Sequence, residues 1–160
     1  TNVGGWESCK IRTMLSDYFD KLPDELQEMI KEVNKNTNEG GQSKNIVTTS
    51  DKLWLFSPAE IFSPTAIKTG WSLLRDHATY YTQEGTQYEF YRNLVGDEDP
   101  NNKIESLIKK LSNGNGEASM WWLRSPSIST KLSIICIEAS GKLNGYNATF
   151  ENGICFGFCL

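Results

Sequence analysis

Few residues in the chain are suited to acid–base or thiol chemistry. His77 is the only histidine, and it stands beside Asp76. A lone histidine lacks the nucleophile and the orienting partner that acid–base catalysis needs, so we interpret His77 as an exposed loop residue. Cys136 and Cys159 are candidates for a reactive thiol pair, but no adjacent cation or histidine lowers their pKa, and apolar neighbours raise it. We therefore expect no catalytic residues.

Candidate metal ligands are also sparse. Residues 97–99 are Asp-Glu-Asp and are followed by Asn101 and Asn102, a set of oxygen ligands suited to Ca²⁺. The segment lacks the glycine turn and the bidentate glutamate of an EF-hand loop, so we interpret it as a solvated acidic loop. The cysteines lack the CxxC spacing of a zinc site. We expect neither a metal nor another cofactor.

The cysteines leave two alternatives open for their redox state. Cys155 and Cys159 would lie roughly 13 Å apart in an extended strand, which is too far for a disulfide. Either the cysteines are free thiols that pack as small hydrophobic side chains, or Cys136 forms a bridge with a cysteine of the terminal strand. The spacing therefore does not identify the redox compartment.

The composition is that of one ordinary domain. The chain has 160 residues, enough to bury a core without a metal or a disulfide framework. Its formal net charge of −4 provides no basic face for a phosphate backbone, so we expect no nucleic-acid partner. No apolar stretch approaches the ~20 residues that span a bilayer, so we expect no membrane insertion. Because the chain begins with threonine, we expect a mature or excised segment. We also expect it to be the C-terminal part of a larger protein.

The first third of the chain has a helical pattern. Apolar residues recur at three- and four-residue spacing over 11–22, which predicts an amphipathic helix. Pro23 suits the first turn of a second helix that would present Leu26, Ile30 and Val33. The polar segment 34–44, with two glycines at its centre, predicts an exposed hairpin loop.

The middle of the chain is less regular. Residues 46–49 and 53–56 are rich in β-forming side chains and predict core strands. Ser57, Pro58 and Glu60 form the start signal of a short capped helix. We expect long, partly ordered loops over 63–101, and a helix over 102–111 that ends at the glycine-rich residues 113–116.

The last third consists of short strands. Residues 120–123, 132–137 and 154–158 are apolar runs separated by Ser-, Gly- and Asn-rich turns. Helices followed by strands predict an α+β fold, in which N-terminal helices pack on short antiparallel sheets. Trp121 and Trp122 must point to opposite faces of their strand, and we expect both in the core with one of them partly exposed. Arg124 is interpreted as a structural donor to backbone carbonyls or a carboxylate.

Five motifs occur in a fixed order along nearly the whole chain. They are GGWES at 4–8, TTSDKLWL at 48–55, GTQYE at 85–89, WWLRSP at 121–126, and a terminal GI and GFCL at 153–154 and 157–160. Together they resemble a family of bacterial and phage domains that carries the WWLRSP hexapeptide and a GFCL-like end. This resemblance implies a C-type-lectin-like fold, related to that of formylglycine-generating enzymes. It also implies a location on a bacterial cell surface or a phage particle.

Some members of that family are variable proteins of diversity-generating retroelements. In those proteins an adenine-directed mutagenesis rewrites codons between the WWLRSP segment and the final strand. The resemblance therefore implies that specificity is determined by residues 127–152. Four residues of this segment cannot arise from an asparagine codon by changes of adenine alone; they are Lys131, Glu138, Lys142 and Glu151.

We therefore expect a non-catalytic module that binds a protein or a glycan on another surface. Aromatic side chains supply large contact area at low entropy cost, while Ser, Thr and Asn adapt their hydrogen bonds. The hypothesised binding face consists of Ser127, Ser129, Lys131, Glu138, Ser140, Lys142, Asn144, Tyr146, Asn147, Thr149 and Phe150. Two alternatives remain: an oxidoreductase of the formylglycine-generating type that uses Cys136 or Cys159, and a structural or oligomer-forming module of a surface or tail protein.

Overall fold

Short helices and short strands make up the chain, and the predicted α+β class is confirmed. The computed structural model describes residues 1–112 and 116–160. The helices are α1 (Lys10–Phe19), α2 (Asp24–Met29), α3 (Pro58–Ile61), α4 (Pro64–Thr69), α5 (Ser72–Arg75), α6 (Ala78–Tyr81), α7 (Glu89–Leu94) and the 3₁₀ turn η1 (Glu105–Leu107). The strands are β1 (Val33–Asn38), β2 (Ile46–Asp51), β3 (Trp54–Leu55), β4 (Lys109–Lys110), β5 (Ala118–Ser119), β6 (Trp121–Pro126), β7 (Ser133–Ile137), β8 (Leu143–Asn147), β9 (Gly153–Ile154) and β10 (Phe156–Gly157).

A four-stranded sheet with the order β8-β7-β6-β9 lies at the centre of the fold. Strands β6, β7 and β8 are antiparallel neighbours, but β9 pairs with β6 in parallel. The prediction of purely antiparallel sheets is therefore wrong at this edge. The chain leaves β8 beside the start of β7 and returns to the start of β6 before β9 begins, so β9 runs in the same direction as β6.

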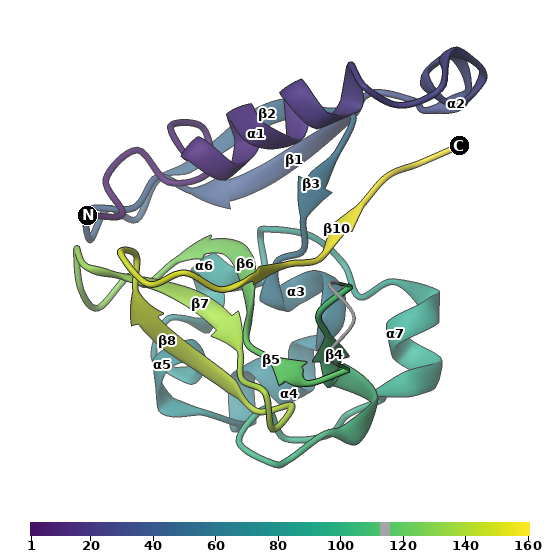
Figure 1. Ribbon diagram of the computed structural model, residues 1–160. Coiled ribbons are helices and arrows are strands. Elements are labelled where there is room, and N and C mark those ends of the chain that lie inside the picture. The colour runs from purple at the N-terminus through teal and green to yellow at the C-terminus, as the bar shows by residue number, and fades with distance from the viewer. Residues whose placement is uncertain (113–115) are drawn as a thin grey trace.

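The central sheet separates two hydrophobic cores. Side chains alternate between its faces, so Trp121 packs into one core and Trp122 into the other, with 1% and 4% of their surface exposed. Both tryptophans therefore lie in the core as expected, but the partial exposure expected for one of them is wrong. The first core joins the sheet to helices α3, α4, α5, α6 and α7. The second joins it to α1 and β3, and Figure 1 shows α1 and the β1-β2 hairpin together on that side.

The N-terminal predictions hold in part. Helix α1 confirms the amphipathic pattern and buries Leu15 and Phe19. Helix α2 ends at Met29, earlier than expected, and Val33 already begins a strand. The predicted loop 34–44 is wrong over its first half, because β1 pairs with β2 along its full length. Polar side chains of β1 alternate, with Asn34 and Asn36 exposed and Lys35 and Thr37 buried, while the two central glycines do form the turn.

The middle of the chain is more helical than its sequence suggests. Residues 63–101 form α4 to α7 rather than loops, because each of these helices buries one or two apolar side chains, too few to produce a visible period. The predicted helix 102–111 is wrong: only a 3₁₀ turn forms, followed by β4. Its predicted end at 113–115 lies outside the described residues. The capped helix α3 is confirmed, with Glu60 Oε2 accepting from Ser57 N at 2.9 Å.

Candidate functional site

Most of the hypothesised binding residues lie at or just beyond the two ends of the β7-β8 hairpin. One group occupies the tight turn that joins β7 to β8: Glu138, Ser140 and Lys142. The other group lies beyond the opposite end, where Ser133 pairs with Asn147. Five paired residues extend the hairpin by roughly 15 Å. The two groups therefore form separate surfaces rather than one face.

The predicted exposure of these residues is wrong in one case. Ser127 is fully buried at the end of β6, where its N–H donates to Ser133 O at 2.9 Å. It is framework rather than binding face, because the backbone turns inward there. The exposed members of the set are Ser129, Lys131, Lys142, Thr149 and Phe150. The half-buried members are Glu138, Ser140, Asn144, Tyr146 and Asn147.

At the β7-β8 turn, most of the polar side chains bond to one another. The Glu138 carboxylate accepts from Asn144 Nδ2 and from Ser140 Oγ, the latter at 3.2 Å. Gly141 has φ +85° and packs so closely that a Cβ atom there would lie 2.1 Å from Ile104 O. These groups hold the turn against the body of the domain, so we assign them a structural role.

At the opposite end, a loop and a turn present side chains to solvent. We call residues 129–132 and 146–150 the loop–turn surface. Asn2 Nδ2 lies within hydrogen-bond distance of three carbonyl oxygens in or beside it, those of Ser127 (3.1 Å), Thr130 (2.8 Å) and Ser133 (2.7 Å). The backbone N–H of Asn2 also donates to Lys131 O at 2.7 Å. The loop is thus held largely through its carbonyl groups, while Ser129 Oγ contacts His77 and Thr130 Oγ1 accepts from Leu132 N.

The turn of this surface is held by backbone bonds and by the side chain of Asn147. Ala148 N donates to Leu132 O at 2.9 Å and joins the turn to the loop. Asn147 Oδ1 accepts from Thr149 N at 3.1 Å, as in an Asx turn. Phe150 extends outward and meets Tyr146 edge to face, with 6.1 Å between the ring centroids. The result is an ordered surface of mixed chemistry.

A pocket of about 460 Å³ adjoins this surface. The sheet and the turn form one side of it, through Ile134, Ala148 and Thr149, and the N-terminal segment and α1 form the other. In Figure 1 the N-terminus lies close to the end of the hairpin. A ligand on the loop–turn surface would therefore have a recess next to it.

A family model described as Domain of unknown function (DUF6273) matches residues 1–160. The chain belongs to this family. No curated protein and no solved structure matches the chain. Because the family match covers the full sequence, the N-terminal segment that positions the loop lies within the same DUF6273 domain as the loop itself.

His77 of the DUF6273 domain is not the exposed loop residue that was expected. It is half-buried and precedes α6, and its Nε2 lies 3.1 Å from Ser129 Oγ. The histidine therefore contacts the loop–turn surface through Ser129. Its one polar contact with a serine hydroxyl is no catalytic triad, because a third orienting group is not among the described contacts of its ring.

Arg124 lies in a buried cluster of charges, as its structural interpretation predicted. It donates to Leu55 O (2.8 Å) and Glu84 O (2.7 Å), and its Nη1 also meets the Glu60 carboxylate. Lys35 Nζ reaches the other oxygen of Glu60 at 3.0 Å. Burial alone would raise the pKa of Glu60, but Arg124 and Lys35 hold it below the ordinary value. Burial lowers the pKa of Lys35.

Glu84 completes the cluster and has the most perturbed carboxyl group. Burial raises its pKa to about 7, against the attraction of Arg124. Its carboxylate accepts from Asn38 N at 2.9 Å and from Ser125 Oγ. The cluster thereby ties β1 to β6 and to the segment after α6. Sequence reasoning missed Lys35 and Glu84, because neither stands in a motif that signals burial.

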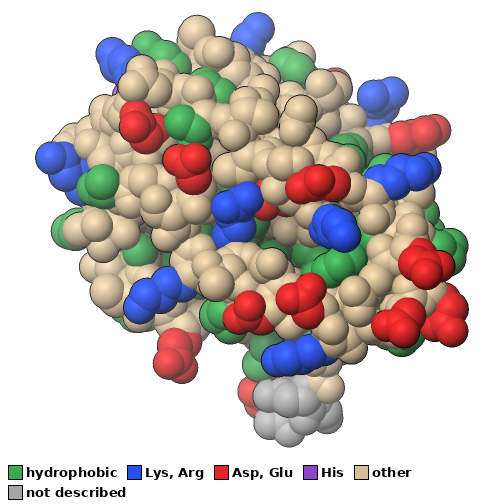
Figure 2. Space-filling model, turned by 90° about the horizontal axis from the view of Figure 1, so that it is seen from above, with side chains coloured by type: hydrophobic (Ala, Val, Ile, Leu, Met, Phe, Trp, Pro, Cys, Tyr) green, Lys and Arg blue, Asp and Glu red, His purple; other side chains and the backbone are tan. Residues whose placement is uncertain are grey.

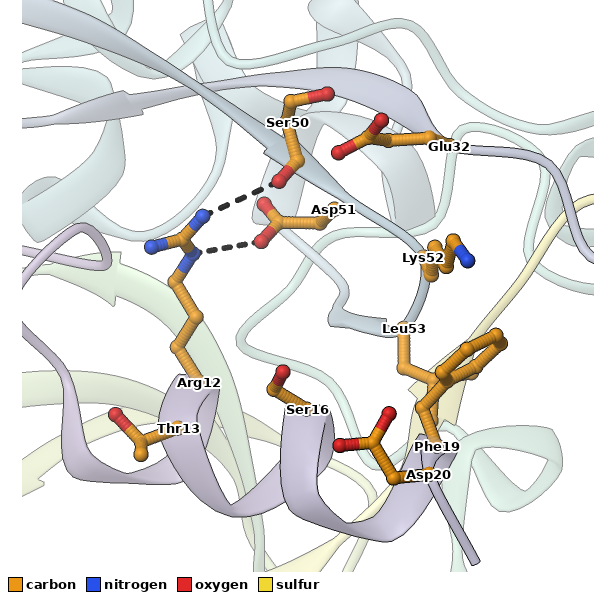
Figure 3. A pocket seen from close by; sticks show the side chains of 10 residues that line it. All are labelled: Arg12, Thr13, Ser16, Phe19, Asp20, Glu32, Ser50, Asp51, Lys52 and Leu53. Atoms are coloured by element: carbon orange, nitrogen blue, oxygen red, sulfur yellow. Dashed lines mark hydrogen bonds and ion pairs between the residues drawn. The ribbon is translucent and has the colours of Figure 1, made fainter. Parts of the chain in front are cut away.

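A second, polar cavity of about 440 Å³ lies between α1 and the end of β2 (Figure 3). Arg12 Nε contacts Asp51 Oδ1 at 2.6 Å, and Asp51 Oδ2 accepts from Trp6 Nε1 at 3.0 Å. These bonds join α1 to β2, so we assign them to the framework. The face of the molecule seen in Figure 2 carries acidic and basic side chains interspersed, without a continuous basic patch.

The cysteines and acidic residues offer little for catalysis or metal binding. All four cysteines are free, and burial raises the pKa of Cys136 to about 12. Asp97 accepts from Ser63 Oγ, the N-cap residue of α4, and Asp99 Oδ1 accepts from Asn101 N at 2.9 Å within a local turn. Within residues 1–112 and 116–160, no group of three His, Cys, Asp or Glu side chains is arranged around a common metal position.

The helices of the described chain are all short. None of them combines the length and the apolar character that a membrane crossing requires.

Proposed function

We propose that this DUF6273 domain is a non-catalytic ligand-binding module with a C-type-lectin-like fold. It recognises a protein or glycan on a bacterial or phage-host surface through the loop–turn surface. The observation that carries this proposal is the hydrogen bonding of Asn2, which holds the loop by its carbonyl oxygens while Lys131, Leu132, Thr149 and Phe150 face solvent.

Anchoring of the loop through its backbone matters because the loop conformation then does not depend on the identity of its exposed side chains. A loop held by its own side chains loses its conformation when they change, whereas a loop held by its carbonyl groups keeps it. Recognition by rigid aromatic anchors and adaptable polar groups then requires only a change of side chain. This supports the proposed relation to variable proteins, and the binding face is the exposed part of the loop–turn surface, residues 129–132 and 146–150.

The chemistry of the loop–turn surface also favours recognition over catalysis. It combines a cation at Lys131, apolar area at Leu132 and Phe150, and a hydroxyl at Thr149. Such mixtures are typical of binding interfaces, in which an aromatic residue contributes most of the contact area. The adjoining pocket of about 460 Å³ offers a recess for part of a ligand.

A screen of glycans and bacterial surface proteins, followed by substitution, tests this proposal. Phe150→Ala is expected to weaken binding at least tenfold, because the ring is 57% exposed and its loss removes contact area without disturbing the core. Phe90→Ala is the matched control, since Phe90 is 63% exposed on α7. Equal affinities of the wild type and Phe150→Ala would contradict the proposal.

Light scattering addresses the oligomer-forming alternative with the same variants. The proposal predicts that the wild type and Phe150→Ala have the same mass across the concentrations of the binding assay. If the wild type is a stable multimer and Phe150→Ala is a monomer, the function of this surface is self-association rather than ligand recognition.

A further inference from the structure

The recess of about 460 Å³ beside the loop–turn surface has a largely apolar wall. Ile11, Ile134 and Ala148 line it and are only half-buried, so each keeps part of its surface open. Leu55 and Trp122, which belong to the second core, also line it. A group that enters such a recess gains from apolar contact and loses its hydrogen bonds to water.

The polar side chains of the recess are already bonded within the domain. Asn2 Oδ1 accepts from Gly41 N at 2.9 Å, and its amide nitrogen is bonded to the carbonyl groups of the loop. The Arg124 guanidinium belongs to the buried charge cluster. The Thr149 hydroxyl donates to Asn147 Oδ1 at 3.1 Å. The hydroxyl groups of a glycan would therefore find few free partners there, and an unpaired polar group is costly to bury.

Three large apolar side chains surround the recess and are exposed. Val3 lines it and is 61% exposed. Leu132 is 52% exposed, and its carbonyl oxygen accepts from Ala148 N at 2.9 Å. Phe150, next to Thr149 in the turn, is 57% exposed. Single exposed apolar residues are common, but several around one recess are typical of a protein-binding surface.

Two exposed lysines flank the recess. Lys10 lines it, and Lys131 lies on the loop, where its carbonyl oxygen accepts from Asn2 N at 2.7 Å. Neither lysine forms an ion pair with another described residue. No Asp or Glu is among the described residues that line the recess. Because binding partners carry complementary charges, this arrangement favours a partner with carboxylates beside its apolar group.

We propose that the ligand of the loop–turn surface is a protein, and that one of its apolar side chains, flanked by Asp or Glu residues, occupies the recess. This inference rests on the function proposed above. The apolar side chain packs against Ile11, Ile134 and Ala148. Leu132 and Phe150 exclude water around it, and the two lysines meet the carboxylates. A buried side chain surrounded by contacts that exclude water is the usual arrangement of a binding hot spot.

Selection of short random peptides on the immobilised wild-type domain, with a glycan array in parallel, tests this inference. The enriched peptides are expected to share a large apolar residue flanked by Asp or Glu. Fluorescence anisotropy then measures the affinity of one enriched peptide for each variant. Ala148→Leu fills the recess and should weaken binding at least tenfold. Ala139→Leu, the matched control at an exposed position of the β7-β8 turn, should change it less than twofold.

Reversal of the two charges provides a test that leaves the apolar wall intact. The double variant Lys10→Glu and Lys131→Glu alters only exposed side chains and should weaken the peptide at least fivefold. Lys68→Glu, exposed on α4, is its control and should change the affinity less than twofold. Circular dichroism verifies the fold of each variant, and the charge reversal decides the matter where Ala148→Leu fails to fold.

The possible failures separate this inference from the function on which it rests. A glycan whose binding Phe150→Ala weakens would overturn the protein ligand and retain recognition by the loop–turn surface. An enriched peptide that Phe150→Ala weakens, but that Ala148→Leu and the charge reversal leave unchanged, would overturn the role of the recess alone. Absence of any enriched peptide would also overturn the inference. If Phe150→Ala binds the peptide as tightly as the wild type does, both proposals are wrong.

Discussion

Replacement of Arg124 by methionine should be among the most damaging single changes in the domain. The guanidinium is buried and bonds to two carbonyl oxygens and to the Glu60 carboxylate. Removing one partner of a buried ion pair typically costs 3–5 kcal/mol because a buried charge loses its compensation. Lys35 still pairs with Glu60 in the variant, so we expect the lower end, about 3 kcal/mol.

The assay is urea denaturation followed by tryptophan fluorescence, since tryptophans pack in both cores. In thermal denaturation of a chain of this size, a loss of about 3 kcal/mol in the free energy of unfolding corresponds to a fall in Tm of roughly 6–12 °C. Arg92→Met, at an exposed position on α7, is the control and should change stability by less than ~0.5 kcal/mol. A loss below ~1 kcal/mol for Arg124→Met would refute the view that this cluster holds β1 to β6.

Two further predictions follow from buried groups whose pKa is raised. The folded-state pKa of Glu84 is about 7, so its protonated form favours the folded state below pH 4.5, and this contribution is lost as the pH rises through 7. Urea denaturation at pH 5 and pH 8 gives the difference in the free energy of unfolding between Glu84→Gln and the wild type. This difference should shift by roughly 2–4 kcal/mol in favour of the variant at pH 8. The same difference at both pH values would contradict the raised pKa of Glu84. Cys136 should react with iodoacetamide at pH 8 at least a hundredfold more slowly than the exposed Cys159, because burial raises its pKa to about 12. Comparable rates by mass spectrometry would instead favour the oxidoreductase alternative.

Features with local causes could be predicted from the sequence. The period of α1, the capping residues of α3 and the alternation of Trp121 and Trp122 each depend on residues within one turn or strand. Arg124 was also predictable, because a guanidinium between apolar strand residues needs acceptors.

The β1 strand could not be predicted, for a physical reason. Its polar residues look like a loop, but Lys35 and Asn38 bond to Glu60 and Glu84, which are distant in the sequence. The cavity between β3, α7 and the C-terminal segment depends in the same way on the pairing of β10 with β3. Likewise, nothing near Ser127 signals that the chain turns inward there, because the anchor, Asn2, stands at the other end of the sequence.

The most direct test of a loop held by its backbone compares two kinds of substitution. One replaces the exposed side chains of the loop–turn surface, and the other replaces Asn2, which anchors the loop. A variant with alanine at Ser129, Lys131, Leu132, Thr149 and Phe150 should keep its free energy of unfolding within ~1 kcal/mol of the wild type, because these side chains face solvent. Asn2→Ala should lose roughly 2–4 kcal/mol, because several carbonyl oxygens lose their donor. The opposite ranking, with a stable Asn2→Ala and an unfolded alanine variant, would contradict a loop held by its backbone.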